Sequence, residues 1–171
     1  MGRFAWIRRG SLPLHFELLC NGSPFGSLSW AQGSRSTAVA EMAGGVFVFR
    51  RKGLFLQQIV VENLREETIA KISLNPLNRS GELRQPDGSR YSFRVKGGLQ
   101  WIDAGGRIMA RIENVNGVEG SVTEYSSFEK SLPLVLVFAG WYLRVTLRRD
   151  RTAGSLPIVP DTLVRKPLGA L

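Results

Sequence analysis

The stretch Leu134–Leu143, which reads LVLVFAGWYL, decides how this chain folds, because it contains no charged residue. It also lacks the alternation of apolar and polar residues found in most of the chain. Ser131 can cap a helix that starts here, and Pro133 is tolerated in a first helical turn. Basic residues from Arg144 onward suit the negative end of the helix dipole. The sequence therefore predicts one hydrophobic helix over about residues 131–148.

A helix that is apolar on every side is buried either in protein or in lipid. Lys130 and Arg144 bracket 13 residues, which span about 20 Å as a helix. A bilayer core is about 30 Å thick. Extending the run to Leu147 would include Arg144 and Thr146. We therefore expect a helix buried in the middle of the domain, and a membrane-inserted segment 132–147 is the alternative.

Most of the chain before this helix reads as short strands. The apolar positions of the two clearest alternating segments are Tyr91, Phe93, Val95, Ile108, Ala110 and Ile112. Successive side chains of a strand point to opposite faces, so each segment has one apolar and one basic face. The stretch 46–49, Val-Phe-Val-Phe, is apolar on both faces and predicts a more central strand.

Turn signals separate these segments. Pro86-Asp87-Gly88 suits a tight hairpin, Asn116-Gly117 suits a second one, and Asp103 is placed to make a third turn. The regular spacing predicts a mostly β domain of about ten to twelve short strands, arranged as a sandwich or a barrel.

Many short strands followed by one wholly apolar helix is an unusual order. The stretches that carry a resemblance are Gly45–Gly53 (GVFVFRRKG), Tyr91–Val95 (YSFRV), Leu99–Gly106 (LQWIDAGG) and Leu132–Leu143. On these stretches the chain resembles the tubby C-terminal-like superfamily, which includes tubby-like proteins, LURP-one-related proteins and phospholipid scramblases. The resemblance implies a closed antiparallel β-barrel around a buried C-terminal hydrophobic helix, and closure would remove exposed strand edges.

The resemblance also implies a division of the chain. The tubby-like barrel with its central helix would cover residues 14–149. Residues 1–13 would then form an N-terminal extension. For residues 150–171 the sequence itself predicts an extended tail, because Pro157, Pro160 and Pro167 break any long element and the apolar residues there have no period.

Two scramblase features are missing from this sequence. The proposed acidic calcium-binding segment has no counterpart, since only Glu119, Glu124 and Glu129 lie near the helix. Scramblases also carry clustered cysteines to which lipid is attached, and this chain has no such cluster because Cys20 is its one cysteine. Scramblase activity and a particular phosphoinositide specificity are therefore not carried over to this chain.

The sequence offers no catalytic constellation. Cys20 and His15 are the one possible Cys–His pair, but on a strand over 14–20 they would point to opposite faces. One cysteine allows no intrachain disulfide and favours a reducing cytoplasm, and one His with one Cys makes no ordinary zinc site. We predict a non-enzymatic protein without cofactor or metal, in which Cys20 is a small buried residue.

Positive charge is the strongest functional signal. Lys and Arg number 23 against 14 Asp and Glu, a formal net charge of +9 that attracts polyanions. The three basic clusters are Arg8 and Arg9; Arg50, Arg51 and Lys52; and Arg148 and Arg149, with Arg151 close by. Arginine suits planar contacts to phosphate. We predict these clusters as anion-binding residues, the alternative being that they are solvated turn charges and helix-end partners.

Together these features predict a binding domain that recognises an anionic partner, foremost phosphorylated lipid headgroups. It would act in the cytoplasm or peripherally at the membrane surface. A basic nucleic-acid-binding module is the alternative, although only Trp6 lies next to a basic pair where an aromatic ring could stack on a base. A membrane-inserted, scramblase-like protein is a third hypothesis.

Overall fold

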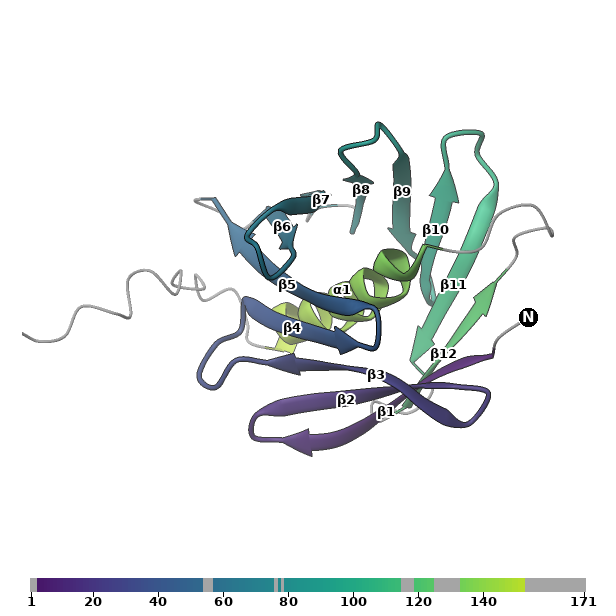
Figure 1. The fold of residues 1–171 in the computed structure, drawn as a ribbon. Coiled ribbons are helices and arrows are strands. Elements are labelled where there is room, and N and C mark those ends of the chain that lie inside the picture. Colours follow the sequence, from purple (N-terminus) through teal and green to yellow (C-terminus); the bar gives the residue numbers. More distant parts are fainter. Residues whose placement is uncertain are drawn as a thin grey trace, which may run out of the picture.

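The computed structural model of the chain describes residues 3–53, 57–75, 77, 79–114, 119–124 and 133–152. Within these residues, twelve strands form a ring around one helix, α1, at Leu134–Thr152 (Figure 1). The strands are β1 Phe4–Ser11, β2 Leu14–Cys20, β3 Ser23–Trp30, β4 Thr37–Met42, β5 Gly45–Lys52, β6 Gln58–Glu62, β7 Thr68–Asn75, β8 Ser80–Arg84, β9 Arg90–Val95, β10 Leu99–Asp103, β11 Ile108–Asn114 and β12 Glu119–Glu124.

Pairing between the first and the last strand closes the ring. Each strand pairs antiparallel with the next in sequence, and β1 pairs with β12 from Phe4↔Val122 to Ile7↔Glu119. The predicted closed β-barrel is confirmed. The predicted N-terminal extension over residues 1–13 is wrong, because β1 completes the barrel and its Phe4 and Trp6 side chains are buried in the core.

The barrel encloses helix α1, as the apolar run predicts. From Leu136 to Leu143 every side chain is fully buried, apart from Gly140, which has none. The indole Nε1 of Trp101 donates a hydrogen bond to the Leu136 carbonyl at 2.9 Å, and the Tyr142 hydroxyl donates to the Ser36 carbonyl at 2.7 Å. Burial raises the pKa of Tyr142, so its hydroxyl keeps the proton that it donates. In the described part of the chain, no helix has the length and apolarity needed to cross a bilayer.

Aromatic rings fill the space between the helix and several strands, among them β1, β3 and β5. Trp6 of β1 stacks on Trp141 with ring centroids 5.6 Å apart. Trp30 of β3 and Phe49 of β5 both stack on the next helix residue, Tyr142, at 5.7 and 5.0 Å. Such pairs add about 0.5–1.5 kcal/mol each beyond the burial of their area, so they favour one rotational setting of the helix.

The helix extends further than its predicted end near residue 148. It continues to Thr152, so residues 150–152 form its last turn and do not begin the tail. The Asp150 carboxylate accepts two hydrogen bonds from Arg51 of β5, at 2.9 and 3.2 Å, which fix this turn to the barrel. The predictions that lie outside the described residues are the Ser131 cap, the Asn116-Gly117 turn and the tail over 153–171.

The predicted turns at Asp87 and Asp103 are confirmed. Asp87 Oδ1 accepts a hydrogen bond from the Ser89 amide at 2.8 Å. Asp103 Oδ1 accepts from the amides of Gly105 and Arg107 at 2.9 Å. These bonds favour the charged carboxylate and lower the pKa of both aspartates, through Ser89 and Arg107 respectively.

One predicted inward position is wrong. Ile108 is expected inside, but it is 38% exposed, whereas Met109 is 8% exposed. The register between β10 and β11 changes from Trp101↔Ala110 to Ile102↔Ile108. Met109 is therefore the extra residue of a β-bulge, which shifts the alternation by one position.

The apolar stretch 46–49 does not mark a central strand, because every described strand of the ring has two neighbours. Phe47 and Phe49 face the helix, where Phe47 meets Phe138 edge-on and Phe49 stacks on Tyr142. The intervening Val48 lies half-buried on the opposite face of β5.

Gly120 of β12 allows the helix to pack closely against the barrel. A Cβ atom at this position would lie 2.1 Å from the Trp141 ring and 2.8 Å from the Glu113 carbonyl. Because Trp141 is fully buried, its ring has little room to move. We predict that Gly120→Ala lowers the free energy of unfolding by about 1–3 kcal/mol, the usual cost of overpacking, as measured by urea unfolding.

Gly44 provides the matched control for this substitution. It lies between β4 and β5, and a Cβ atom there would meet nothing within 4 Å. Gly44→Ala should change stability by no more than about 0.5 kcal/mol. Equal stability of the two variants would contradict the placement of Trp141 against β12.

Candidate anion-binding site

The C-terminal end of α1 emerges at one end of the barrel, beside the β1–β2 and β3–β4 connections, on the left of Figure 1. We name this the helix-exit end. A cavity of about 340 Å³ lies here between the helix and the strands. The residues that line it are Arg8, Ser11, Leu14, Phe16, Asn114, Val145, Arg148 and Arg149. Among these described lining residues there are three arginines and no acid, and we name the cavity the basic pocket.

Strand alternation brings Arg8 into the basic pocket. Phe4 and Trp6 of β1 are buried in the core, and Arg8 continues this inward series where the strand reaches the barrel end. The register of β1 against β2 shifts between Arg8 and Gly10. Arg9 is exposed and its Nε donates to Glu17 Oε2 at 2.7 Å. Two adjacent arginines therefore have different surroundings.

The helix brings Arg148 and Arg149 to the same cavity. Val145, one turn earlier, is 8% exposed and lines the inner wall of the pocket. The ion pair between Arg51 and Asp150 holds the turn that follows, and the Arg51 side chain is only 7% exposed. The position of the two pocket arginines is thus fixed by apolar burial on one side and by a largely buried ion pair on the other.

A second cavity, of about 330 Å³, adjoins the basic pocket and shares Ser11, Leu14 and Arg149 with it. The remaining residues of this neighbouring cavity are Leu12, Pro13, Trp30, Ala31, Gln32, Gly33, Ser34 and Arg35. Arg149 therefore lies between the basic pocket and the second cavity, and Arg35 adds a further cation to the second cavity.

Burial and neighbouring positive charges disfavour the charged form of two arginines at this end. The pKa of Arg149 is lowered, first by burial and next by the charge of Arg35. The pKa of Arg144 is also lowered, first by burial and then by Arg79 and Arg148. The nearby acids that act in the opposite direction are Glu113 and Asp150. Like charges held together disfavour one another, and a bound anion would relieve this repulsion.

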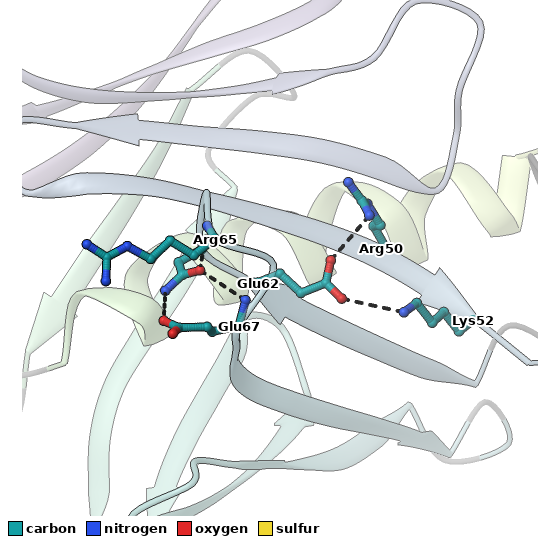
Figure 2. A network of polar contacts seen from close by, with 6 residues as sticks. Arg50, Lys52, Glu62, Arg65 and Glu67 are labelled. Atoms are coloured by element: carbon teal, nitrogen blue, oxygen red, sulfur yellow. Dashed lines mark hydrogen bonds and ion pairs between the residues drawn. The ribbon is translucent and has the colours of Figure 1, made fainter.

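The predicted cluster Arg50, Arg51 and Lys52 is divided by the strand that carries it. Arg51 points inward to Asp150, whereas Arg50 and Lys52 approach Glu62 on the other face, at 3.2 and 3.5 Å (Figure 2). Acidic residues thus accompany all three side chains. Of the seven predicted residues, the structure brings together Arg8, Arg148 and Arg149.

Arg35 is the cation that sequence reasoning misses. It stands alone in the connection between β3 and β4 and belongs to no basic cluster. The strand order would have identified it. In a ring of antiparallel strands that follow the sequence, the β1–β2 and β3–β4 connections lie at the same end, so Arg35 comes to the end where Arg8 lies. The second missed residue is Asp150, whose pairing with Arg51 spans 99 positions of sequence.

The candidate Cys–His pair is not assembled. His15 is directed to Ser29, whose Oγ lies 2.5 Å from Nδ1, while Cys20 packs against the core. The expected opposite orientation is thus confirmed, although Cys20 is only partly buried. Within the residues that the structure describes, no group of three or more His, Cys, Asp or Glu side chains is placed so that it could hold a metal ion.

No family model, no curated protein and no solved structure matches this chain. The resemblance to the tubby C-terminal-like superfamily therefore stays a hypothesis.

The Arg51–Asp150 pair should contribute measurably to stability. We predict that Asp150→Asn lowers the free energy of unfolding by about 2 kcal/mol, because it weakens two hydrogen bonds between charged groups. Urea unfolding measures this loss. Glu17→Gln is the matched control: its partner Arg9 is 53% exposed, and such pairs contribute less than about 1 kcal/mol. An equal effect of the two substitutions would show that Asp150 does not anchor the helix.

Proposed function

We propose that the basic pocket binds a phosphate-bearing anion, and that its natural occupant is a phosphorylated lipid headgroup. The observation that carries this proposal is the convergence of Arg8 with Arg148 and Arg149, from opposite ends of the sequence, in one cavity. Guanidinium groups present paired donors that match phosphate oxygens and bind them by charge-assisted hydrogen bonds. The volume of about 340 Å³ also falls within the range of small-molecule sites.

The helix dipole opposes an anion at this end, but only weakly. The C-terminal carbonyls of a helix act as roughly half a negative charge. The three arginines carry full positive charges, and Arg35 lies beside the adjoining cavity. The nearby acids Glu113 and Asp150 form ion pairs with two other arginines, Arg111 and Arg51. The balance of charge at the basic pocket therefore favours an anion.

Nucleic acid is the alternative ligand, and it has less support. Binding of single strands commonly uses exposed aromatic rings on which bases stack. All four tryptophans of the chain are buried, with at most 2% of their surface exposed. Their rings serve the packing of the barrel and helix.

This proposal makes the protein a non-enzymatic binding domain, with a tubby-like barrel as its scaffold. It would act in the cytoplasm, peripherally at the membrane surface. The separation of His15 from Cys20 supports a role in binding over thiol catalysis.

A soluble inositol phosphate tests the pocket without a membrane. We predict that wild-type protein binds it in calorimetry, and that added salt weakens the binding by screening. Replacing Arg8, Arg148 and Arg149 together by Gln should lower the affinity at least tenfold, since each charge-assisted bond contributes about 1.5–3 kcal/mol.

A control with the same change of net charge is available at the opposite end of the barrel. Arg65, Arg84 and Arg90 are all exposed there, and their joint replacement by Gln should leave the affinity nearly unchanged. Equal losses in both variants would mean that net charge alone attracts the ligand. Tighter binding of duplex DNA than of the inositol phosphate at matched salt would favour the nucleic-acid alternative.

A further inference from the structure

Two leucines are almost fully exposed at the helix-exit end. Leu12 is 97% exposed in the β1–β2 connection, and Leu77 is 95% exposed in the β7–β8 connection. In a ring of antiparallel strands that follow the sequence, alternate connections lie at the same end. These two connections are six strands apart in a ring of twelve. Leu12 and Leu77 therefore project from opposite sides of one rim.

The same rim is basic. The described residues of the connections at this end include three cations, Arg35, Arg79 and Lys96, and no acid. These described connection residues are 12–13, 31–36, 53, 57, 77, 79 and 96–98. The opposite end is mixed in charge. Its connections contain Arg65, Glu66, Glu67, Asp87 and Arg107. The barrel thus has one end that combines positive charge with exposed apolar tips.

We infer that the helix-exit end docks on an anionic lipid bilayer, with Leu12 and Leu77 entering the interface. This inference rests on the proposed function, because the same orientation places a phosphorylated headgroup in the basic pocket. It adds the orientation of the protein on the bilayer: the helix-exit end of the barrel faces the membrane, and the C-terminal end of helix α1 points toward it.

The chemistry of the rim favours a bilayer over other polyanions. Transfer of an exposed leucine side chain from water to an apolar medium lowers the free energy. An anionic bilayer offers such a medium beneath a layer of negative headgroups. A nucleic-acid duplex presents charge but no apolar layer that two separated tips could enter together. Leu12 lies between Ser11 of the basic pocket and Pro13, so its insertion brings the pocket to headgroup depth.

Binding to vesicles tests the inference against the soluble ligand. The probe is a vesicle of phosphatidylcholine with phosphatidylinositol phosphate, and cosedimentation measures partition. Leu12→Ala combined with Leu77→Ala should lower partition at least tenfold, since six aliphatic carbon atoms, three from each leucine, no longer leave water. The affinity for soluble inositol phosphate should not change. The matched control is Leu64→Ala, in the β6–β7 connection of the opposite end, where Leu64 is 73% exposed; its partition should equal that of wild type.

Insertion has a direct signature as well. The Leu12→Trp variant should lose fluorescence on vesicles with brominated acyl chains, while the Leu64→Trp variant should not, and the four buried native tryptophans give a constant background.

The outcomes separate this inference from the proposed function. Wild-type partition by the Leu12 and Leu77 variant, or no quenching of the Leu12→Trp variant, would overturn membrane docking even if the pocket binds inositol phosphate. Failure of the wild type to bind soluble inositol phosphate would refute the proposed function instead. A wild-type preference for duplex DNA over these vesicles would overturn both.

Discussion

The apolar surface of helix α1 has to be kept from water, and the twelve strands achieve this together. Burying one large aliphatic or aromatic side chain contributes about 1.5–3 kcal/mol, and every side chain of the helix from Leu136 to Leu143 is fully buried. A ring of eight strands is already filled by its own side chains. Twelve strands leave a wider interior, which the helix occupies. The helix and the closed ring therefore each require the other, and closure also satisfies the strand edges.

Once the helix runs through the barrel, the placement of charge follows from geometry. The polar last turns of α1 emerge at one end and bring Arg148 and Arg149 to the rim. Strand alternation directs Arg8 inward to them and leaves Arg9 outside with Glu17. The same rule turns Arg51 toward Asp150 while Arg50 and Lys52 face Glu62. A linear cluster in the sequence is thus separated in space, and distant arginines are gathered.

The fold was predictable to the extent that it depends on local patterns. The uncharged run before Arg144 indicates a buried helix, and alternation with turn residues indicates the strands. Closure through β1 was missed because the stretch that carries the resemblance was taken to begin at residue 14, which left Phe4 and Trp6 outside the predicted barrel. The bulge at Met109 depends on pairing with β10 and leaves no signal in its own segment.

The candidate site was predictable only as a list of cations. The sequence identifies Arg8, Arg148 and Arg149 among other basic residues, but their convergence depends on which strand follows which around the ring. Arg35 has no local signal at all. Neutralising partners such as Glu62 and Asp150 are likewise invisible, because they come from other strands or from the helix.

The central claim is that α1 lies inside the barrel and so carries its arginines to the rim. A Cβ atom on Gly140 would lie 2.0 Å from Cδ1 of Ile112 in β11, so helix and strand are in direct contact there. The most direct measurement is an isotope-edited NOE spectrum of the detergent-free protein. The account predicts a strong cross-peak between the Ile112 δ1 methyl protons and the Gly140 α-protons. Absence of this cross-peak, in a spectrum where both resonances are assigned and sharp, would contradict a helix inside the barrel.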